Sequence, residues 1–173
     1  MTTSTPTIRP ATPSDAAALA AFVERVFRAT FAADNRPEDM AAYCAQAFGP
    51  ARQLGEIEAV GVHTLLIECG GLVGCAQVRA GLPPSCVTTD QPIELRRFYI
   101  DTPWHGHGVA QQLMRAVMAI ARAEGAGSVW LGVWERNPRA VAFYAKCDFV
   151  DVGSLPFQLG HDLQTDRVMV VGL

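Results

Sequence analysis

The sequence has no excess of basic charge and no long apolar run. It carries 14 Lys and Arg against 17 Asp and Glu, which gives a net charge of −3. A nucleic-acid-binding surface usually needs a basic face. A helix that crosses a bilayer needs about 20 consecutive apolar residues, and no stretch approaches that length. We therefore expect neither nucleic acid nor a membrane as a partner.

Closely spaced cysteines and a signal segment are lacking as well. The five cysteines are odd in number, and no two of them have C-x-x-C spacing. This pattern argues against a disulfide framework and against a zinc site. The segment from Met1 to Pro10 is rich in Thr and does not have the charged and then apolar pattern of a secretory signal. These absences predict a cytoplasmic protein without a bound metal.

The sequence does contain enough apolar material for a core. Of its 173 residues, 50% are hydrophobic and 18% are charged. A chain of this length and composition fits one globular domain. It shows no internal repeat, low-complexity tract or linker. We therefore predict a single domain over residues 1–173.

Hydrophobic spacing and turn residues predict helices and a hairpin in the first half of the chain. The expected elements are a strand over Thr5 to Arg9, helices starting near Thr12-Pro13 and Pro37, a weaker helix over Ala51 to Ala59, and hairpin strands over Val62 to Glu68 and Leu72 to Arg79 around Gly70-Gly71. The helix starts rest on capping residues and on Pro in the first turn.

In the second half, strands alternate with helices. The expected elements are the strand Glu94 to Ile100, the helix Gly108 to Ala123, the strand Ser128 to Trp134, the helix Pro138 to Cys147, and two final strands over Phe149 to Leu155 and Arg167 to Val171. A strand–helix–strand unit joins two parallel strands by a right-handed crossover. The predicted fold class is therefore mixed α/β.

A glycine-rich turn stands between the strand that ends at Ile100 and the helix that follows. Gly106 and Gly108 lie just before the amphipathic helix. The first amides of a helix have no partner within it, and its dipole is positive at that end. Glycines let those amides approach an anion closely. The turn has neither a P-loop nor a dinucleotide-binding pattern, so by itself it predicts an anion site or a tight turn without a ligand.

A second segment, downstream of the crossover, carries further information. Asn137 is a good N-cap and Pro138 a good first helical residue. Local physics does not explain why Phe143 and Tyr144 follow as a pair on a short helix.

Together, the two segments resemble the GNAT family of acyl-CoA-dependent N-acyltransferases. The turn of that family has Gln or Arg, then Gly three positions later, then Gly or Ala two positions after that. This chain has His105, Gly108 and Ala110, so only the first position departs from the pattern.

The helix motif of the family is also present. The family has Asn, then Ala or Ser three positions later, then Phe or Tyr followed by Tyr. The match consists of Asn137, Ala140, Phe143 and Tyr144. Asp148 stands where the family usually has Gly, which can alter the bend into the next strand.

The resemblance implies a GNAT-type fold, with a central mixed sheet of about seven strands and two splayed parallel strands flanked by helices. It implies acetyl-CoA as the acyl donor. The turn residues His105, Gly106, His107, Gly108, Val109 and Ala110 would hold the pyrophosphate. The pantetheine arm would pair with the main chain of Phe98, Tyr99 and Ile100 and with Asn137, and Phe143 would pack against the cofactor or the core. His105 and His107 are more simply neutral surface groups than cations.

The resemblance also implies catalytic roles. Glu94 is the candidate general base, acting through a water on the amine, and its alternative is a strand-end carboxylate in solvent or paired with Arg96 or Arg97. Tyr144 is the candidate acid for the leaving thiolate, and its alternative is a core tyrosine. The main-chain N–H of Tyr99 or Ile100 would stabilise the oxyanion.

The acceptor predicted by the resemblance is a primary amine. The segment from Phe31 to Phe48 should line the acceptor cleft and loosely resembles the bacterial polyamine-acetyltransferase branch. Glu38, Asp39 or Asp34 would then attract the cations, although solvated helix carboxylates are the simpler interpretation. The alternatives are a protein N-terminus or lysine as acceptor, or a coenzyme A-binding regulatory module without turnover. We expect a monomer or a homodimer.

Overall fold

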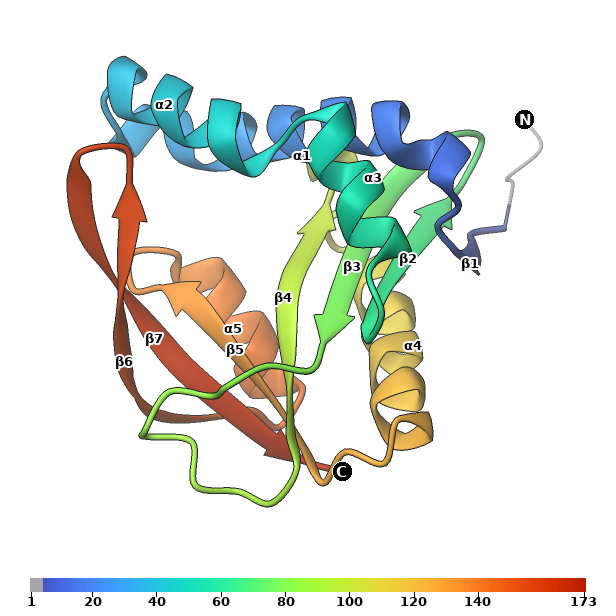
Figure 1. Ribbon diagram of the computed structural model, residues 1–173, viewed down its shortest axis with the longest axis vertical. Helices are drawn as coiled ribbons and strands as arrows, with labels where there is room; N and C mark the ends of the chain where they lie inside the picture. Colours follow the sequence, from blue (N-terminus) through green and yellow to red (C-terminus); the bar gives the residue numbers. More distant parts are fainter. Residues whose placement is uncertain (1–4) are drawn as a thin grey trace.

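A seven-stranded mixed sheet organises residues 5–173, the part of the chain that the computed structural model describes (Figure 1). The strand order is β1-β2-β3-β4-β5-β7-β6. The strands are β1 (Thr7–Pro10), β2 (Val62–Glu68), β3 (Leu72–Arg79), β4 (Pro92–Ile100), β5 (Ser128–Trp134), β6 (Val150–Leu159) and β7 (Asp162–Gly172). Part of the N-terminal segment in which no signal is expected, residues 1–4, lies outside the described residues.

Helices cover both faces of this sheet. They are α1 (Ala16–Phe31), α2 (Pro37–Ala47), α3 (Pro50–Glu58), α4 (Val109–Ala123) and α5 (Pro138–Lys146), with short 3-10 turns at Pro13–Asp15, Ala32–Asp34 and Thr102–Trp104. Alternate strand residues face opposite sides. Leu65 and Ile67 of β2 share a buried cluster with α4, whereas Leu66 between them is buried with α1 and α2. Within residues 5–173, no helix has the length and apolarity needed to cross a membrane.

The structure confirms the predicted mixed α/β fold with its parallel strand pair. Strands β4 and β5 are parallel, and their register runs from Pro92 opposite Ser128 to Glu94 opposite Trp130. After Glu94 the two strands separate, and β4 continues to pair with β3 on its other side. The remaining length of β4 therefore presents main-chain groups to a gap, as the predicted splay requires.

The last two strands are longer than predicted. Strand β6 extends to Leu159 and β7 starts at Asp162, so that Gly160 and His161 form a two-residue turn. The expected loop between Leu155 and Arg167 was wrong. Pro156 and the polar run after Gly160 are typical of a loop, but pairing of β7 with β5 and β6 on its two sides holds these residues in the sheet. Proline is tolerated because β6 is the edge strand.

Candidate active site

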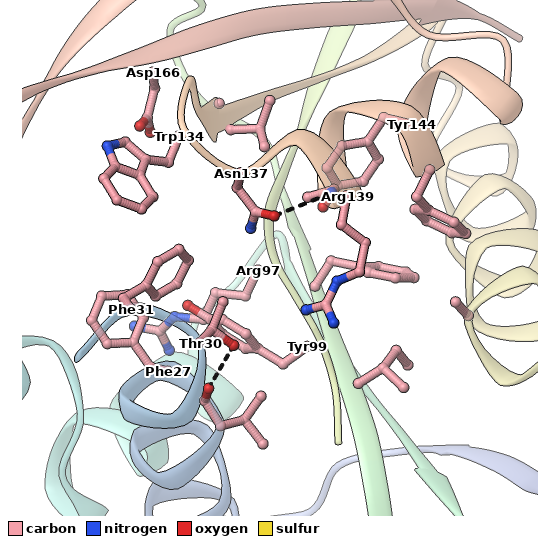
Figure 2. Close-up of a pocket in the computed structure, with 18 of the residues that line it drawn as sticks. Phe27, Thr30, Phe31, Arg97, Tyr99, Trp134, Asn137, Arg139, Tyr144 and Asp166 are labelled. Atoms are coloured by element: carbon pink, nitrogen blue, oxygen red, sulfur yellow. Dashed lines mark hydrogen bonds between the residues drawn. The ribbon is translucent and has the colours of Figure 1, made fainter. Parts of the chain in front are cut away.

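A cavity of about 340 Å³ lies where β4 and β5 separate. Its walls come from β4, from the ends of β5 and α1, from α2, from the start of α4, from α5 and from the β6–β7 hairpin. Figure 2 shows Tyr144, Asn137 and Arg139 on one side of it, with Phe27, Phe31 and Trp134 on the other. The cavity thus connects the two sequence segments that carry the motifs.

The glycine-rich turn has the geometry of an anion cradle. Gly106 and Gly108 have φ values of +80° and +78°, a left-handed conformation that favours glycine. A Cβ at either position would meet no atom within 4 Å, so the turn is open on this side. The first bond inside α4 runs from Gln112 N–H to Gly108 O at 3.1 Å. The three preceding amides, of residues 109–111, therefore have no helical acceptor and can bind an anion.

The two histidines of the turn have different roles. His105 Nε2 lies 2.9 Å from Ile100 O, and its Nδ1 lies 2.8 Å from Nη1 of Arg139. Since a guanidinium only donates, Nδ1 accepts, and His105 is the neutral tautomer with its proton on Nε2. His107 instead lies outside the cavity, against Trp104 at 6.4 Å between ring centroids.

Arg139 is a site residue that the sequence analysis missed. It lines the cavity beside His105 and comes from the first turn of α5. Through this contact, His105, which departs from the family pattern, holds the Arg139 guanidinium next to the anion cradle. Val109 is 1% exposed, so its side chain belongs to the core and only its amide is available to the site.

The main chain of β4 offers alternate amides to the gap. Asp101 N–H donates to Val73 O of β3 at 2.9 Å. In an antiparallel pair, amides point alternately toward and away from the partner strand. Given that register, Tyr99 N–H points toward β3, and the amides of Phe98 and Ile100 point toward β5. Of the two predicted oxyanion donors, only Ile100 therefore faces the gap, and its carbonyl is bound by His105.

A bulge precedes these residues. Gln77 pairs with Arg97 and Val78 with Leu95, so Arg96 is the extra residue in β4. This bulge increases the local twist where the strands part.

Asn137 caps α5 as predicted. Its Oδ1 accepts a hydrogen bond from Ala140 N–H at 3.2 Å (Figure 2). The side-chain amide nitrogen of Asn137 has no acceptor among the described residues and borders the cavity. Both the cap and a ligand contact are thus available to one side chain.

Phe143 and Tyr144 stand on the same wall. Phe143 stacks on Phe98 with 5.5 Å between ring centroids. Tyr144 is 8% exposed and lies edge-on to Phe98 and Phe149. Burial raises the pKa of the Tyr144 phenol above its usual value of about 10. No described residue bonds its hydroxyl, so a protonated phenol remains available to a ligand in the cavity.

Glu94 lies outside the cavity wall. Its carboxylate accepts a hydrogen bond from Arg79 Nε in the neighbouring strand. Of the two interpretations weighed from the sequence, this geometry favours the paired carboxylate, although the partner is Arg79 instead of Arg96 or Arg97. Those two arginines both bind Glu56 of α3.

A different carboxylate, Asp166 of β7, borders the cavity. It lies directly opposite Trp134 in the β5–β7 register, and Figure 2 shows the two side by side. Burial, with a smaller effect from Glu135, raises the pKa of Asp166 to about 6. Sequence reasoning did not find this residue because it placed residues 156–166 in a loop.

The three carboxylates expected to attract a cationic acceptor, Asp34, Glu38 and Asp39, lie in different surroundings. Asp39 is 2% exposed, and its Oδ1 accepts from His161 N–H at 2.7 Å. Of the two interpretations weighed for Asp39, a cation-attracting group or a solvated helix carboxylate, the structure favours neither, because this buried carboxylate joins α2 to the β6–β7 turn. Glu38 is exposed, and Asp34 borders a neighbouring hollow with Arg136 and Arg139.

Comparisons with a family model and with related sequences indicate the same family. The sequence model of the Acetyltransferase (GNAT) family matches residues 22–149. An uncharacterized N-acetyltransferase of Mycobacterium bovis is 41% identical over 101 residues, which are 58% of this chain and 60% of that protein. This chain thus matches less than two thirds of the length of that relative. An uncharacterized N-acetyltransferase of Lactobacillus delbrueckii subsp. lactis is 29% identical over 150 residues, 86% of this chain and 87% of that one.

Solved structures share the fold. The PaiA N-acetyltransferase of Thermoplasma acidophilum, crystallised in complex with coenzyme A, superposes with a TM-score of 0.77. The superposition covers 98% of this chain and 99% of that one at 17% sequence identity. At this identity the likeness concerns the fold alone.

Proposed function

This chain belongs to the GNAT family of acetyltransferases, and we propose on that premise that it transfers an acetyl group from acetyl-CoA to a primary amine. The observation that carries the proposal is the convergence of the open amide turn, the free edge of β4 and the Tyr144 hydroxyl on one cavity. These groups suit a ligand with an anionic end, an amide-containing arm and a reactive thioester.

The turn and the β4 edge would hold the donor. The amides of residues 109–111 and the nearby Arg139 guanidinium suit the pyrophosphate. The amides of Phe98 and Ile100 face the gap, where an extended pantetheine arm could pair as an added strand. Coenzyme A in the Thermoplasma acidophilum enzyme supports this choice of ligand. The proposal requires no metal.

Two groups of this chain would then act on the thioester. The Ile100 amide, directed into the gap, would donate to the carbonyl oxygen as negative charge develops on it. The Tyr144 hydroxyl would donate a proton or a hydrogen bond to the departing thiolate. Burial raises the pKa of Tyr144, but the same apolar surroundings also favour the neutral thiol. Transfer would be direct, within a ternary complex of donor and acceptor.

Membership of the family indicates that the acceptor is an amine, and it does not indicate which kind of amine. The names of the Mycobacterium bovis and Lactobacillus delbrueckii relatives state N-acetyltransferase and no acceptor, and they give the polyamine branch no support. A small amine is favoured because the donor arm would fill part of the cavity and leave limited room beside the aromatic rings. A protein N-terminus, a lysine side chain and a regulatory role without turnover are the competing proposals.

Thiol release from acetyl-CoA tests the proposal. We expect the purified chain to release thiol with at least one primary amine of a panel that includes alkylamines, arylalkylamines, spermidine, amino acids and a short peptide. Acetyl-CoA binding without release for every amine would favour the regulatory alternative instead.

The Tyr144→Phe variant tests the acid. It deletes one hydroxyl that has no partner among the described residues, so folding should be retained. We expect kcat to fall by about 10- to 100-fold, because general acid catalysis typically contributes on that order or more. The Kd for acetyl-CoA, measured by calorimetry, should change less than about twofold. An unchanged kcat would remove Tyr144 from the mechanism.

A further inference from the structure

We propose that Asp166 and the aromatic rings around it form the acceptor subsite, and that this subsite selects a primary amine with a single positive charge and an apolar body. The inference rests on the proposed transfer to an amine and narrows its acceptor. It depends on three observations: the aromatic rings, the unpartnered Asp166 carboxylate, and the lack of any other carboxylate among the described residues that line the cavity.

Aromatic rings from four elements converge on this end of the cavity. Phe31, at the end of α1, meets Trp134 of β5 edge-on at 5.7 Å between centroids. Tyr43 of α2 meets Phe157 of β6 edge-on at 5.3 Å and stacks with Phe27 at 5.0 Å. All five rings border the cavity. Such a wall favours an alkyl or aryl body, and ring faces also attract cations.

Asp166 is the polar feature set into this wall. No described residue donates a hydrogen bond to its carboxylate or forms an ion pair with it. Neighbouring polar groups are occupied with one another. Gln164 Nε2 donates to Asn35 Oδ1 at 2.5 Å, and Asn35 Nδ2 donates to Phe31 O at 2.8 Å. An unpaired carboxylate in an apolar wall is costly unless a ligand supplies the counter-ion.

The backbone makes room for this carboxylate. Gly132 of β5 lies beside Asp166, and a Cβ at that position would be 3.2 Å from Asp166 Oδ2. The carboxylate therefore lies flat over a residue without a side chain, between Trp134 and Leu155, its direct partners in β5 and β6.

The charges near Asp166 do not neutralise it. Arg96 and Arg97 border the cavity, but their guanidinium groups bind Glu56. Arg167, the next residue in β7, binds Asp151. Glu135, which follows Trp134, is a like charge that raises the pKa of Asp166 together with burial. An incoming ammonium is thus the counter-ion that the subsite lacks.

A single available carboxylate, that of Asp166, favours an acceptor with a single ammonium group. Asp39 is bound to the His161 amide, and Glu94 is bound to Arg79. The adjoining hollow contains Asp34 together with two cations, Arg136 and Arg139. Among the described residues, Asp166 is the only carboxylate that lines the cavity. Within it, a second ammonium, as in a polyamine, would have to enter either the aromatic wall or this arginine-bearing hollow, because the exposed Glu135 lies outside the cavity wall. Both placements are unfavourable.

The proton balance assigns a step to the same carboxylate. An ammonium must lose one proton before its nitrogen can attack, and Asp166 would accept that proton and pass it to solvent. The nitrogen then bonds to the acetyl carbon as the carbon–sulfur bond breaks. Tyr144 donates its proton to the leaving thiolate. The second proton of the amine nitrogen, released as the amide forms, then returns to the Tyr144 oxygen. A carboxylate with a raised pKa is a better proton acceptor than an ordinary Asp.

The experiment compares wild type, Asp166→Asn and the control Asp90→Asn, which removes an exposed carboxylate on the loop before β4. The probes are 2-phenylethylamine, hexylamine and spermidine. We expect the wild type to have its highest kcat/KM with the two monoamines. In Asp166→Asn, we expect KM for 2-phenylethylamine to rise at least about 30-fold, as for the loss of one partner of a buried charge pair. The Kd for acetyl-CoA should stay within about twofold, and Asp90→Asn should match wild type.

Two outcomes would overturn the inference while leaving transfer intact: a wild-type KM in Asp166→Asn, or a kcat/KM for spermidine above that of both monoamines. If no amine releases thiol, the proposed function fails. Calorimetric binding of 2-phenylethylamine to the coenzyme A complex then decides the subsite separately. Binding that Asp166→Asn abolishes supports it, and absence of binding in the wild type overturns it.

Discussion

At the scale of single residues, two departures from the family pattern are accommodated in the structure. His105, in place of Gln or Arg, bridges Ile100 O and Arg139, so a cation still stands at the turn. Asp148, in place of Gly, adopts φ +66°, the left-handed conformation that glycine favours and that Asp tolerates better than most residues. The bend after α5 is therefore kept in spite of the substitution.

Asp166 leads to a prediction about stability. Its pKa is raised to about 6 in the folded state, against about 3.9 in an unfolded chain. The folded state therefore binds the proton more tightly, so the stability of the wild type falls as pH rises from about 4 to 6.

The variant Asp166→Asn should remove this pH dependence. We expect it to be more stable than wild type by up to about 3 kcal/mol at pH 7.5, from a shift of about two pKa units at 1.36 kcal/mol each, and to have little advantage at pH 4. Urea unfolding at the two pH values measures the difference. Equal stabilities at pH 7.5 would contradict the burial of an unpaired charge. The expected result is thus a variant that is more stable than wild type at pH 7.5 and binds the acceptor amine less well.

At the scale of elements, the start of α4 is the part that local sequence describes best. The residues of the turn have the conformations that their glycines permit, and the amides behind them are free because a helix begins there. A side chain at Gly108 would occupy the space in front of those amides, which is open in the structure.

The Gly108→Glu variant tests this cradle. We expect the Kd for acetyl-CoA to rise at least about 100-fold, because the new side chain adds bulk and negative charge where the anion would bind. The matched control is Gly125→Glu, just beyond the other end of α4, where φ is +74° and the space is also open. Both variants carry the same backbone strain and charge change. Acetyl-CoA binding by Gly108→Glu that equals that of the control would exclude the pyrophosphate assignment.

At the scale of the whole molecule, α2 and the β6–β7 hairpin together close one end of the cavity, the end proposed for the acceptor. They are more than 100 residues apart in sequence, yet Asp39 Oδ1 accepts from His161 N–H, and Figure 1 shows α2 beside the hairpin tip. Gly160 makes this contact possible. Its φ is +59°, and a Cβ there would be 2.5 Å from the Cα of Asp39.

The Gly160→Ala variant should separate these two elements. We expect a loss of about 1–3 kcal/mol of stability from strain and the forced shift. The KM for the amine should rise several-fold, because Tyr43 and Phe157 no longer meet, while acetyl-CoA binding stays near that of wild type. Gly172→Ala, at the far end of β7 with nothing within 4 Å of the new Cβ, should leave both the stability and the amine KM unchanged. A normal amine KM in Gly160→Ala would show that the hairpin contact does not shape the acceptor end.

The sequence by itself determined the elements whose signals are local. The hairpin at Gly70-Gly71, the parallel crossover, the glycine turn and the Asn137 cap all follow from turn, capping and periodicity rules, and the structure has each of them. The residues of the two family motifs lie together on one cavity, because they stand at chain turns whose geometry nearby residues fix.

The surroundings of Asp166, the proposed acceptor subsite, depend on long-range contacts. The polar run around Asp166 is held in the sheet by two neighbouring strands, and this long-range pairing overrides the local preference for a loop. The same long-range contacts pair Glu94 with Arg79, occupy Asp39 with His161 and bring aromatic rings from four elements to one wall. Which carboxylate stays unpaired depends on all of these contacts together, so no local pattern could identify Asp166.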